Sequence, residues 1–458
     1  MRHLTPRPDG PDASLRRHVL RTLKLATPVV MSRVGMMGLA AMDVVVLGRA
    51  GAEALADYVL ATALYESLFA TMAGLLLGVP VLTARAFGAG DLSSLGPIWR
   101  QGLIYGLLVG TGLCVLLQFA EPMLLWTGQS PEIAARSGVV TGVLALALPA
   151  IALFLVSATF LESIQRPSVG MVTVLLANLS NLAFNIVFVF GWGPIPALGA
   201  IGCAIATVLN AALLAAGVGL YVRFGLKDRV ALGLAGRAGG GWAAAAPLRR
   251  TGYSAGLSSG LEAGAFSVVT LLVGMLGALA LAMHGVLFQF LLLPFMVAFG
   301  IAAATQVRVG NAWGRGDARG LWLAGWIGLA LASLVTGSAA IFYVVMPETL
   351  VRVFTTDPTV IAGAAPMMGW AALALMFDGG QSVMNHACRG RGDTWVPTSF
   401  HVVSYWLILI PAAALLTFPG GQGLAGVYQA IALASVVSLV AMATRFALIA
   451  RRPLDPKV

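Results

Sequence analysis

The chain alternates between long apolar stretches and short polar connections. Twelve of the stretches are long enough to cross a lipid bilayer as an α-helix, which takes about 20 apolar residues. They cover approximately 20–47, 58–84, 97–119, 137–160, 168–192, 199–223, 251–275, 279–307, 321–345, 360–387, 397–418 and 425–449. The pattern therefore predicts an all-α membrane protein with twelve transmembrane helices.

The composition agrees with this class of protein. Of the 458 residues, 59% are apolar and only 10% are charged, and the mean hydropathy is +0.90. Soluble domains carry about 25% charged residues, so this chain has too few of them to cover a surface exposed to water. The net charge of +10 fits the enrichment of Lys and Arg in cytoplasmic loops, and we expect no nucleic-acid partner.

The distribution of positive charge predicts an orientation. With a cytoplasmic N-terminus, 24 of the 28 Lys and Arg residues lie on the cytoplasmic side, and Arg33 lies inside the first helix. Three residues remain for the opposite side, namely Arg49, Arg136 and Arg352. Because Lys and Arg concentrate in cytoplasmic loops, we expect both termini in the cytoplasm.

The two halves of the chain resemble each other at a spacing of 226 residues. Three pairs of segments share it: 84–91 (ARAFGAGD) with 310–317 (GNAWGRGD), 162–167 (ESIQRP) with 388–393 (CRGRGD), and 46–48 (VLG) with 272–274 (LVG). Two halves of six helices with the same topology predict two parallel-repeat lobes around a central cavity.

The longest connection separates these halves and divides the chain into predicted parts. We expect a disordered cytoplasmic tail at 1–16, an N-lobe with helices 1–6 at 17–223, a cytoplasmic linker at 224–250, a C-lobe with helices 7–12 at 251–450, and a second cytoplasmic tail at 451–458.

The stretch 360–387 carries a carboxylate at membrane depth. Asp378 lies in its middle, where a charge costs about 3 kcal/mol on insertion scales. Gln381 and Asn385 follow at i+3 and i+7 and share a helix face with it. Intramembrane carboxylates mark ion or proton pathways, so this face is a candidate site. The alternative is a neutral, hydrogen-bonded carboxyl group that serves only packing.

Glu262 is the central acid of the stretch 251–275 and belongs to the same half as Asp378. We therefore expect the two carboxylates to share one pocket. Two carboxylates in a medium of low dielectric constant do not easily both stay charged, so the pair should hold a proton or attract a cation.

The first half carries its own polar cluster. Asp43 lies towards the outer end of the first helix, and three asparagines follow on one face of helix 5. The predicted polar neighbours of Asp43 are Asn178, Asn181, Asn185 and Thr207. Amide and hydroxyl oxygens beside a carboxylate suit a hard cation or a proton relay. The same amides would also serve simply to tie helices together.

Other polar or soft residues have two interpretations. Glu66 and Arg33 either pair with each other or stand apart, with Arg33 reaching to the membrane surface. Met31 and Met376 belong to helices rich in methionine, which either offer a soft surface to apolar ligands or pack in the core. We count Glu66, Met31, Met376, Gln381 and Asn385 as possible cavity residues.

No motif for enzymatic chemistry or a structural metal is present. The sequence lacks CxxC, HExxH, GxxxxGK[ST] and GxSxG. The five histidines make no ligand pattern with Cys114, Cys203 and Cys388. We therefore expect no cofactor and no catalytic activity, although an intramembrane enzyme and a passive channel are alternatives.

These motifs together resemble the multidrug and toxic compound extrusion (MATE) family, in its bacterial NorM-like branch, over about residues 20–450. The similarity lies in Glu262 and in 42–56 (MDVVVLGRAGAEALA), 78–91 (GVPVLTARAFGAGD), 181–193 (NLAFNIVFVFGWG), 199–210 (GAIGCAIATVLN), 304–317 (ATQVRVGNAWGRGD) and 377–394 (FDGGQSVMNHACRGRGDT).

The resemblance implies a function. Members of this family export cationic amphipathic compounds in exchange for Na⁺ or H⁺. We therefore expect an antiporter that works by alternating access in the bacterial inner membrane. Its expected partners are small cationic or amphipathic substrates and membrane lipids, and we expect a monomer. The alternative is an exporter or flippase of one native metabolite or lipid-linked precursor.

The resemblance also assigns roles to residues. Glu262 and Asp378 are similar to the carboxylates of the C-lobe cation site. Asp43 is similar to the N-lobe carboxylate, with Asn181, Asn185 and Thr207 as its neighbours, but Asn185 stands where some members have an aspartate. Pro28 is similar to the proline at which helix 1 of some members bends, so it is the predicted hinge.

Overall fold

The computed structural model describes residues 14–236 and 241–453. Most of the predicted tail at 1–16, part of the predicted linker, and residues 454–458 of the predicted second tail lie outside the described residues. Within the described ranges, twelve helical segments are long and apolar enough to cross a membrane. Each overlaps one of the twelve predicted stretches, so the prediction of an all-α protein with twelve spans is confirmed.

Several spans consist of more than one helix. In chain order, the helices are α1 (Leu15–Ala50), α2 (Ala52–Leu75), α3 (Gly78–Ala89), α4 (Leu95–Leu117), α5 (Ala120–Trp126), α6 (Pro131–Ala145), α7 (Ala147–Ser163), α8 (Ser168–Phe190), α9 (Gly199–Leu220), η1 (Tyr221–Gly225), α10 (Gly241–Ala244), α11 (Ala246–Gly274), α12 (Ala278–Gly314), α13 (Ala318–Val345), α14 (Pro347–Phe354), α15 (Pro358–Ala364), η2 (Ala365–Met367), α16 (Met368–Gly390), α17 (Trp395–His401), η3 (Val402–Leu409), α18 (Ile410–Thr417) and α19 (Leu424–Ala450).

The sequence explains where several helices begin. Asp317 precedes α13 and accepts a hydrogen bond from the Gly320 N–H at 2.7 Å. Asp357 does the same for α15, accepting from the Thr359 N–H at 2.8 Å, and Pro358 follows it at the first helical position. A carboxylate oxygen at this position satisfies an N–H group that has no partner inside the helix.

The helices group into two compact units. The N-terminal unit comprises 31–87 and 91–256, and the C-terminal unit comprises the described residues up to Val30, Gly88–Gly90 and those from Leu257 onward. The chain passes from one unit to the other within α1, between Val30 and Met31. Helix α1 runs unbroken through Pro28, so the role of this proline as a hinge stays a prediction.

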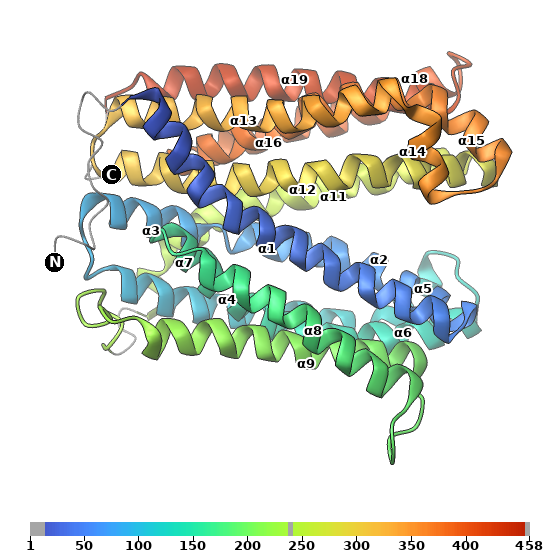
Figure 1. Ribbon diagram of the computed structural model, residues 1–458, viewed down its shortest axis with the longest axis horizontal. Coiled ribbons are helices and arrows are strands. Elements are labelled where there is room, and N and C mark those ends of the chain that lie inside the picture. The colour runs from blue at the N-terminus through green and yellow to red at the C-terminus, as the bar shows by residue number, and fades with distance from the viewer. Residues whose placement is uncertain (1–13, 237–240, 454–458) are drawn as a thin grey trace. The chain divides into compact units, whose positions relative to one another are not determined.

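The same packing scheme recurs in each unit. In the N-terminal unit, α7 packs against α4 and α9, and α8 packs against α9. In the C-terminal unit, α16 packs against α13 and α19, and α18 packs against α19. Figure 1 shows α13, α16 and α19 running side by side. Each helix of the first set corresponds to the helix six spans later in the second set, as the predicted repeat requires.

Individual turns repeat at the predicted spacing of 226 residues. The Asp91 N–H donates to the Ala86 carbonyl at 3.0 Å, and the Asp317 N–H donates to the Ala312 carbonyl at 2.9 Å. Gly90 and Gly316, one residue earlier in each turn, have φ angles of 77° and 72°. Only glycine adopts such angles without strain. The two halves therefore share local backbone conformation as well as helix order.

Part of the predicted linker folds against its own unit. The Gly96 N–H donates to the Leu232 carbonyl at 2.8 Å, and the Arg100 guanidinium donates to the Gly233 carbonyl at 2.8 Å. Leu232 and Leu234 are buried. Residues 226–236 are thus a docked segment and contribute buried apolar surface to the N-terminal unit.

We expect Gly96→Ala to destabilise this docking. A Cβ atom at Gly96 would lie 2.0 Å from the Gly233 carbonyl oxygen, so the backbone of the docked segment must move. The free energy of unfolding should fall by about 1–3 kcal/mol, as for other overpacked sites. Gly112→Ala in the same helix is the matched control, because no atom lies within 4 Å of its added Cβ. Thermal unfolding of the purified protein in detergent measures both, and equal melting temperatures would contradict the prediction.

Candidate functional site

Three helices of the C-terminal unit bring Glu262 and Asp378 together. Glu262 lies on α11, Asp378 on α16 and Tyr405 on η3. The Trp406 indole N–H donates to the Leu261 carbonyl at 2.9 Å and holds η3 against α11. Both carboxylates are half-buried. We call Glu262, Asp378, Gln381 and Tyr405 the C-terminal site.

The two carboxylates share their hydrogen-bond donors. The Tyr405 hydroxyl lies 3.2 Å from Glu262 Oε1 and 3.2 Å from Asp378 Oδ1. Gln381 Nε2 lies 3.4 Å and 3.2 Å from the same two oxygens, and 3.0 Å from the Tyr405 hydroxyl. Because a hydroxyl has one hydrogen, it can satisfy only one carboxylate at a time. Tyr405 and Gln381 therefore carry fewer hydrogens than the contacts they make in this site. A proton or a cation would supply the positive charge that the carboxylates lack.

His401 orients the glutamine of this site. His401 Nε2 lies 3.1 Å from Gln381 Oε1, and in the tautomer with its hydrogen on Nε2 His401 donates to this oxygen. His401 Nδ1 then accepts from the Ser258 hydroxyl at 2.8 Å and lies 3.8 Å from Glu262 Oε2. With its oxygen held by His401, the Gln381 amide turns its N–H groups towards the carboxylates. Asn385 Nδ2 lies 3.2 Å from His401 Nε2, which places Asn385 behind the site.

Asp43 lies at the centre of a second cluster, in the N-terminal unit. Its carboxylate accepts hydrogen bonds from Asn185 Nδ2 at 2.7 Å, from the Tyr58 hydroxyl at 2.8 Å and from the Thr207 hydroxyl at 3.2 Å. Asn185 Nδ2 also donates to Asn181 Oδ1 at 3.1 Å. Asp43, Asn181 and Asn185 are each at most 3% exposed. We call this group the N-terminal site, and Asp43 is its one carboxylate.

Asn178 makes its hydrogen bonds away from the Asp43 carboxylate. Its amide donates to the Gly35 carbonyl at 3.0 Å and to the Val174 carbonyl at 2.8 Å. The bond to Gly35 ties α8 to α1, and the two bonds together occupy the donor group of Asn178. Among the predicted neighbours of Asp43, the structure therefore places Asn181, Asn185 and Thr207 in the cluster and Asn178 outside it.

Arg33 forms an ion pair with Glu162. Arg33 lies 3.5 Å from the carboxylate of Glu162, and both side chains are largely buried. Glu66, the other proposed partner, has an exposed side chain. The pair joins α1 to the end of α7, so Arg33 has a buried acidic partner other than Glu66.

The remaining candidate cavity residues divide by exposure. Met31 and Met376 are 42% and 39% exposed, whereas Gln381 and Asn385 are buried in the hydrogen-bond network. Cys114, Cys203 and Cys388 are buried free thiols. Across the described ranges, no three His, Cys, Asp or Glu side chains come together as a metal site would require.

Sequence reasoning missed two members of the two sites, Tyr58 and Tyr405, and also His401, which contacts Gln381. Tyr58, Tyr405 and His401 each lie in an apolar stretch, where an aromatic side chain usually indicates packing. A tyrosine in an apolar stretch indicates a buried hydroxyl, and a buried hydroxyl needs a hydrogen-bond partner. The sequence therefore offered a signal that Tyr58 and Tyr405 have polar neighbours. The partner itself lies far away along the chain, 15 residues for Tyr58 and 143 for Tyr405 with Glu262.

Comparison with known proteins gives consistent matches. The MatE family model matches residues 28–187 and 255–415. The chain is similar to a Caulobacter vibrioides protein named probable multidrug resistance protein NorM, with 35% identity over 96% of this chain and 93% of that protein. A Deinococcus radiodurans protein of the same name is 33% identical over 95% of this chain and 97% of its own length.

Solved structures show the likeness of fold. The eukaryotic MATE transporter AtDTX14 matches with a TM-score of 0.88 at 20% identity, covering 95% of this chain and 98% of that one. A MATE protein in the bent conformation matches with a TM-score of 0.83 at 18% identity, covering 95% and 96% of the two chains. These matches agree with the fold predicted from the sequence.

Proposed function

Because the chain belongs to the MatE family, we propose that it is a multidrug efflux transporter that exports cationic amphipathic compounds in exchange for Na⁺ or H⁺. The chain is a multi-pass membrane protein, and the resemblance stated from the sequence is confirmed. The relatives that bear the name multidrug resistance protein are bacterial. These relatives support a location in the bacterial inner membrane and a function in transport and not in catalysis.

One observation carries the proposal of cation coupling. Glu262 and Asp378, two half-buried carboxylates, converge on the same two donors, Gln381 and Tyr405. Two negative charges so placed repel each other unless a positive charge or a proton lies between them. The carboxylate oxygens of Glu262 and Asp378 and the hydroxyl oxygen of Tyr405 are ligands that hard cations prefer.

Coupling follows from differential binding. A cation at the C-terminal site shifts the transporter towards the outward-open state only if it binds that state more tightly. Gln381 contributes by orienting the two carboxylates before the ion arrives, and His401 contributes by holding Gln381. An incoming Na⁺ or H⁺ would then favour the state from which the exported compound leaves.

The N-terminal site has different chemistry and a different proposed role. Asp43 is surrounded by neutral donors and carries a single negative charge. A proton alone neutralises it, whereas the pair at the C-terminal site can offer a cation two charges. We assign proton-linked substrate binding to Asp43 and cation binding to Glu262 and Asp378.

The distribution of Lys and Arg supports a cytoplasmic location for both termini. The rival function, export of one anionic native metabolite or lipid-linked precursor, would need unpaired basic residues at membrane depth. Arg33 is the basic residue that the sequence places inside the first helix, and its guanidinium is engaged by Glu162. This pairing favours cationic compounds as substrates.

Efflux of a fluorescent cationic dye from proteoliposomes tests the function. The purified full chain is reconstituted, and Na⁺ and H⁺ gradients are imposed separately. We expect dye transport against its own gradient with at least one of the two ions. Equal transport with and without both gradients would indicate a passive pathway, and the absence of dye transport under every gradient would refute multidrug efflux.

A further inference from the structure

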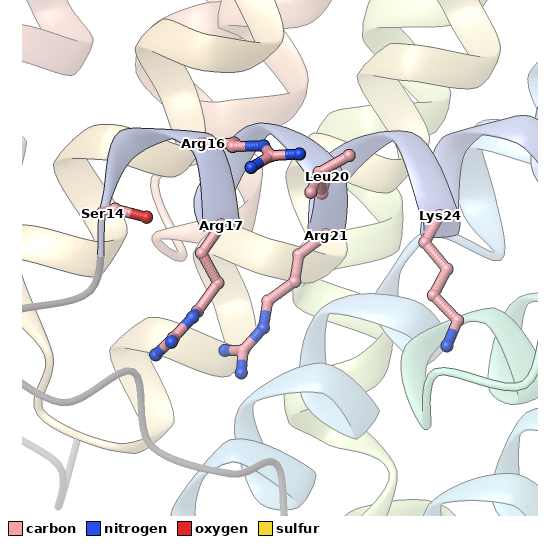
Figure 2. A pocket seen from close by; sticks show the side chains of 6 residues that line it. All are labelled: Ser14, Arg16, Arg17, Leu20, Arg21 and Lys24. Atoms are coloured by element: carbon pink, nitrogen blue, oxygen red, sulfur yellow. The ribbon is translucent and has the colours of Figure 1, made fainter.

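The first turns of α1 carry a basic face. Arg16, Arg17, Arg21 and Lys24 line a surface hollow of about 310 Å³, together with Ser14 and Leu20. Figure 2 shows Arg17, Arg21 and Lys24 extending to the same side of the helix. These three positions are spaced i, i+4 and i+7, which places them on one helix face. No acidic residue is among the six that line the hollow.

A different face of the same turns packs against the rest of the C-terminal unit. His18 and Thr22 are buried, and Arg308 of α12 donates to the His18 carbonyl at 3.2 Å and to the Thr22 hydroxyl. Further along α1, a Cβ atom at Gly300 would lie 2.6 Å from a methyl group of Val30, so α1 and α12 cross closely. These contacts fix the rotation of α1 and present the basic face in one direction.

Apolar side chains border the basic residues. Leu20 and Leu23 are 54% and 40% exposed, and they lie one turn apart beside Arg16 and Lys24. The apolar part of the first membrane span follows directly along α1. Cations next to exposed leucines at the end of a membrane span match both parts of a phospholipid, its phosphate and its acyl chain.

We propose that this hollow binds the headgroup phosphate of an anionic phospholipid. The guanidinium group of Arg17 and the ammonium group of Lys24 would contact the phosphate, and an acyl chain would pack on Leu20 and Leu23. Arg17 and Lys24 are seven residues apart, two turns along one helix face, so their long side chains can reach the same anionic group.

Lipid binding to the purified full chain tests the proposal. The protein in lipid nanodiscs is compared with phosphatidylglycerol or phosphatidylcholine as the titrated lipid, and retained lipid is measured by native mass spectrometry. We expect a preference for phosphatidylglycerol, and we expect Arg17→Gln with Lys24→Gln to weaken its binding by roughly 30-fold, from the usual contribution of two basic residues near a membrane surface.

The matched control is Arg451→Gln with Arg452→Gln. These two exposed arginines follow α19 and lie outside the hollow, so the control removes the same charge elsewhere. Equal weakening in both double variants would overturn the proposal, because it would show a general effect of charge. So would unchanged binding in the Arg17 and Lys24 variant.

A second arm separates the lipid from free phosphate. Inorganic phosphate, titrated as a competitor, should displace phosphatidylglycerol only weakly, because it lacks the acyl contact with Leu20 and Leu23. Displacement at equal concentrations would indicate a site for free phosphate and overturn the lipid assignment. The charge-preserving variant Lys24→Arg should retain lipid binding, which shows that any loss in Lys24→Gln arises from the charge.

Discussion

Asp378→Asn and Glu262→Gln are each expected to abolish cation-driven efflux while the protein still folds and inserts into the membrane. Both changes keep the size of the side chain and remove a titratable charge. A hydrogen-bonded charged group contributes about 2 kcal/mol to binding, so the affinity for the coupling cation should fall roughly 30-fold or more in each variant. Dye efflux from proteoliposomes under an imposed gradient, with the cation titrated, measures the effect.

The shared donors add a second expectation for this pair. Gln381 and Tyr405 contact both carboxylates, so the effects of the two substitutions should not add in the double variant. Glu348→Gln is the matched control, because Glu348 is an exposed acid of the same unit and pairs with the exposed Arg352 at 3.8 Å. Full uphill transport by either single variant would rule out a role for that residue in coupling.

Asp43→Asn is expected to weaken binding of a cationic drug and to flatten its pH dependence. In the proposed mechanism, a charged Asp43 attracts the cationic substrate, and a protonated Asp43 releases it. Wild-type affinity should therefore rise with pH. The asparagine has the shape of the protonated acid and should bind weakly at every pH. Drug affinity measured from about pH 5.5 to 8.5 covers the range in which a buried carboxylate can titrate.

Tyr58→Phe provides the control for Asp43. It removes the 2.8 Å hydrogen bond to the carboxylate but leaves the charge in place. We expect this variant to keep a pH dependence, with a shifted midpoint, because the proton still binds at Asp43. If Asp43→Asn binds the drug as tightly as the wild type and with the same pH profile, Asp43 has no part in substrate release.

The class of protein and the number of spans could be predicted from the apolar pattern alone. Each span is a local property, because about 20 consecutive apolar residues must form a helix in order to satisfy their backbone groups in lipid. The repeat was also readable, since the turns before Asp91 and Asp317 depend on nearby residues such as Gly90 and Gly316. Asp43, Glu262 and Asp378 stood out because a charge at membrane depth is costly.

The side chains that contact these acids could not be predicted in the same way, because they come from helices that packing brings together. Tyr58, Tyr405 and His401 have no periodicity that sets them apart from packing residues, and their partners are brought near by helix packing across many residues. The same limit applies to Asn178, which shares a helix face with Asn181 but bonds to Gly35. Helix periodicity gives the face of a residue, whereas the contact depends on which helix covers that face, and this is set by the packing of the whole unit.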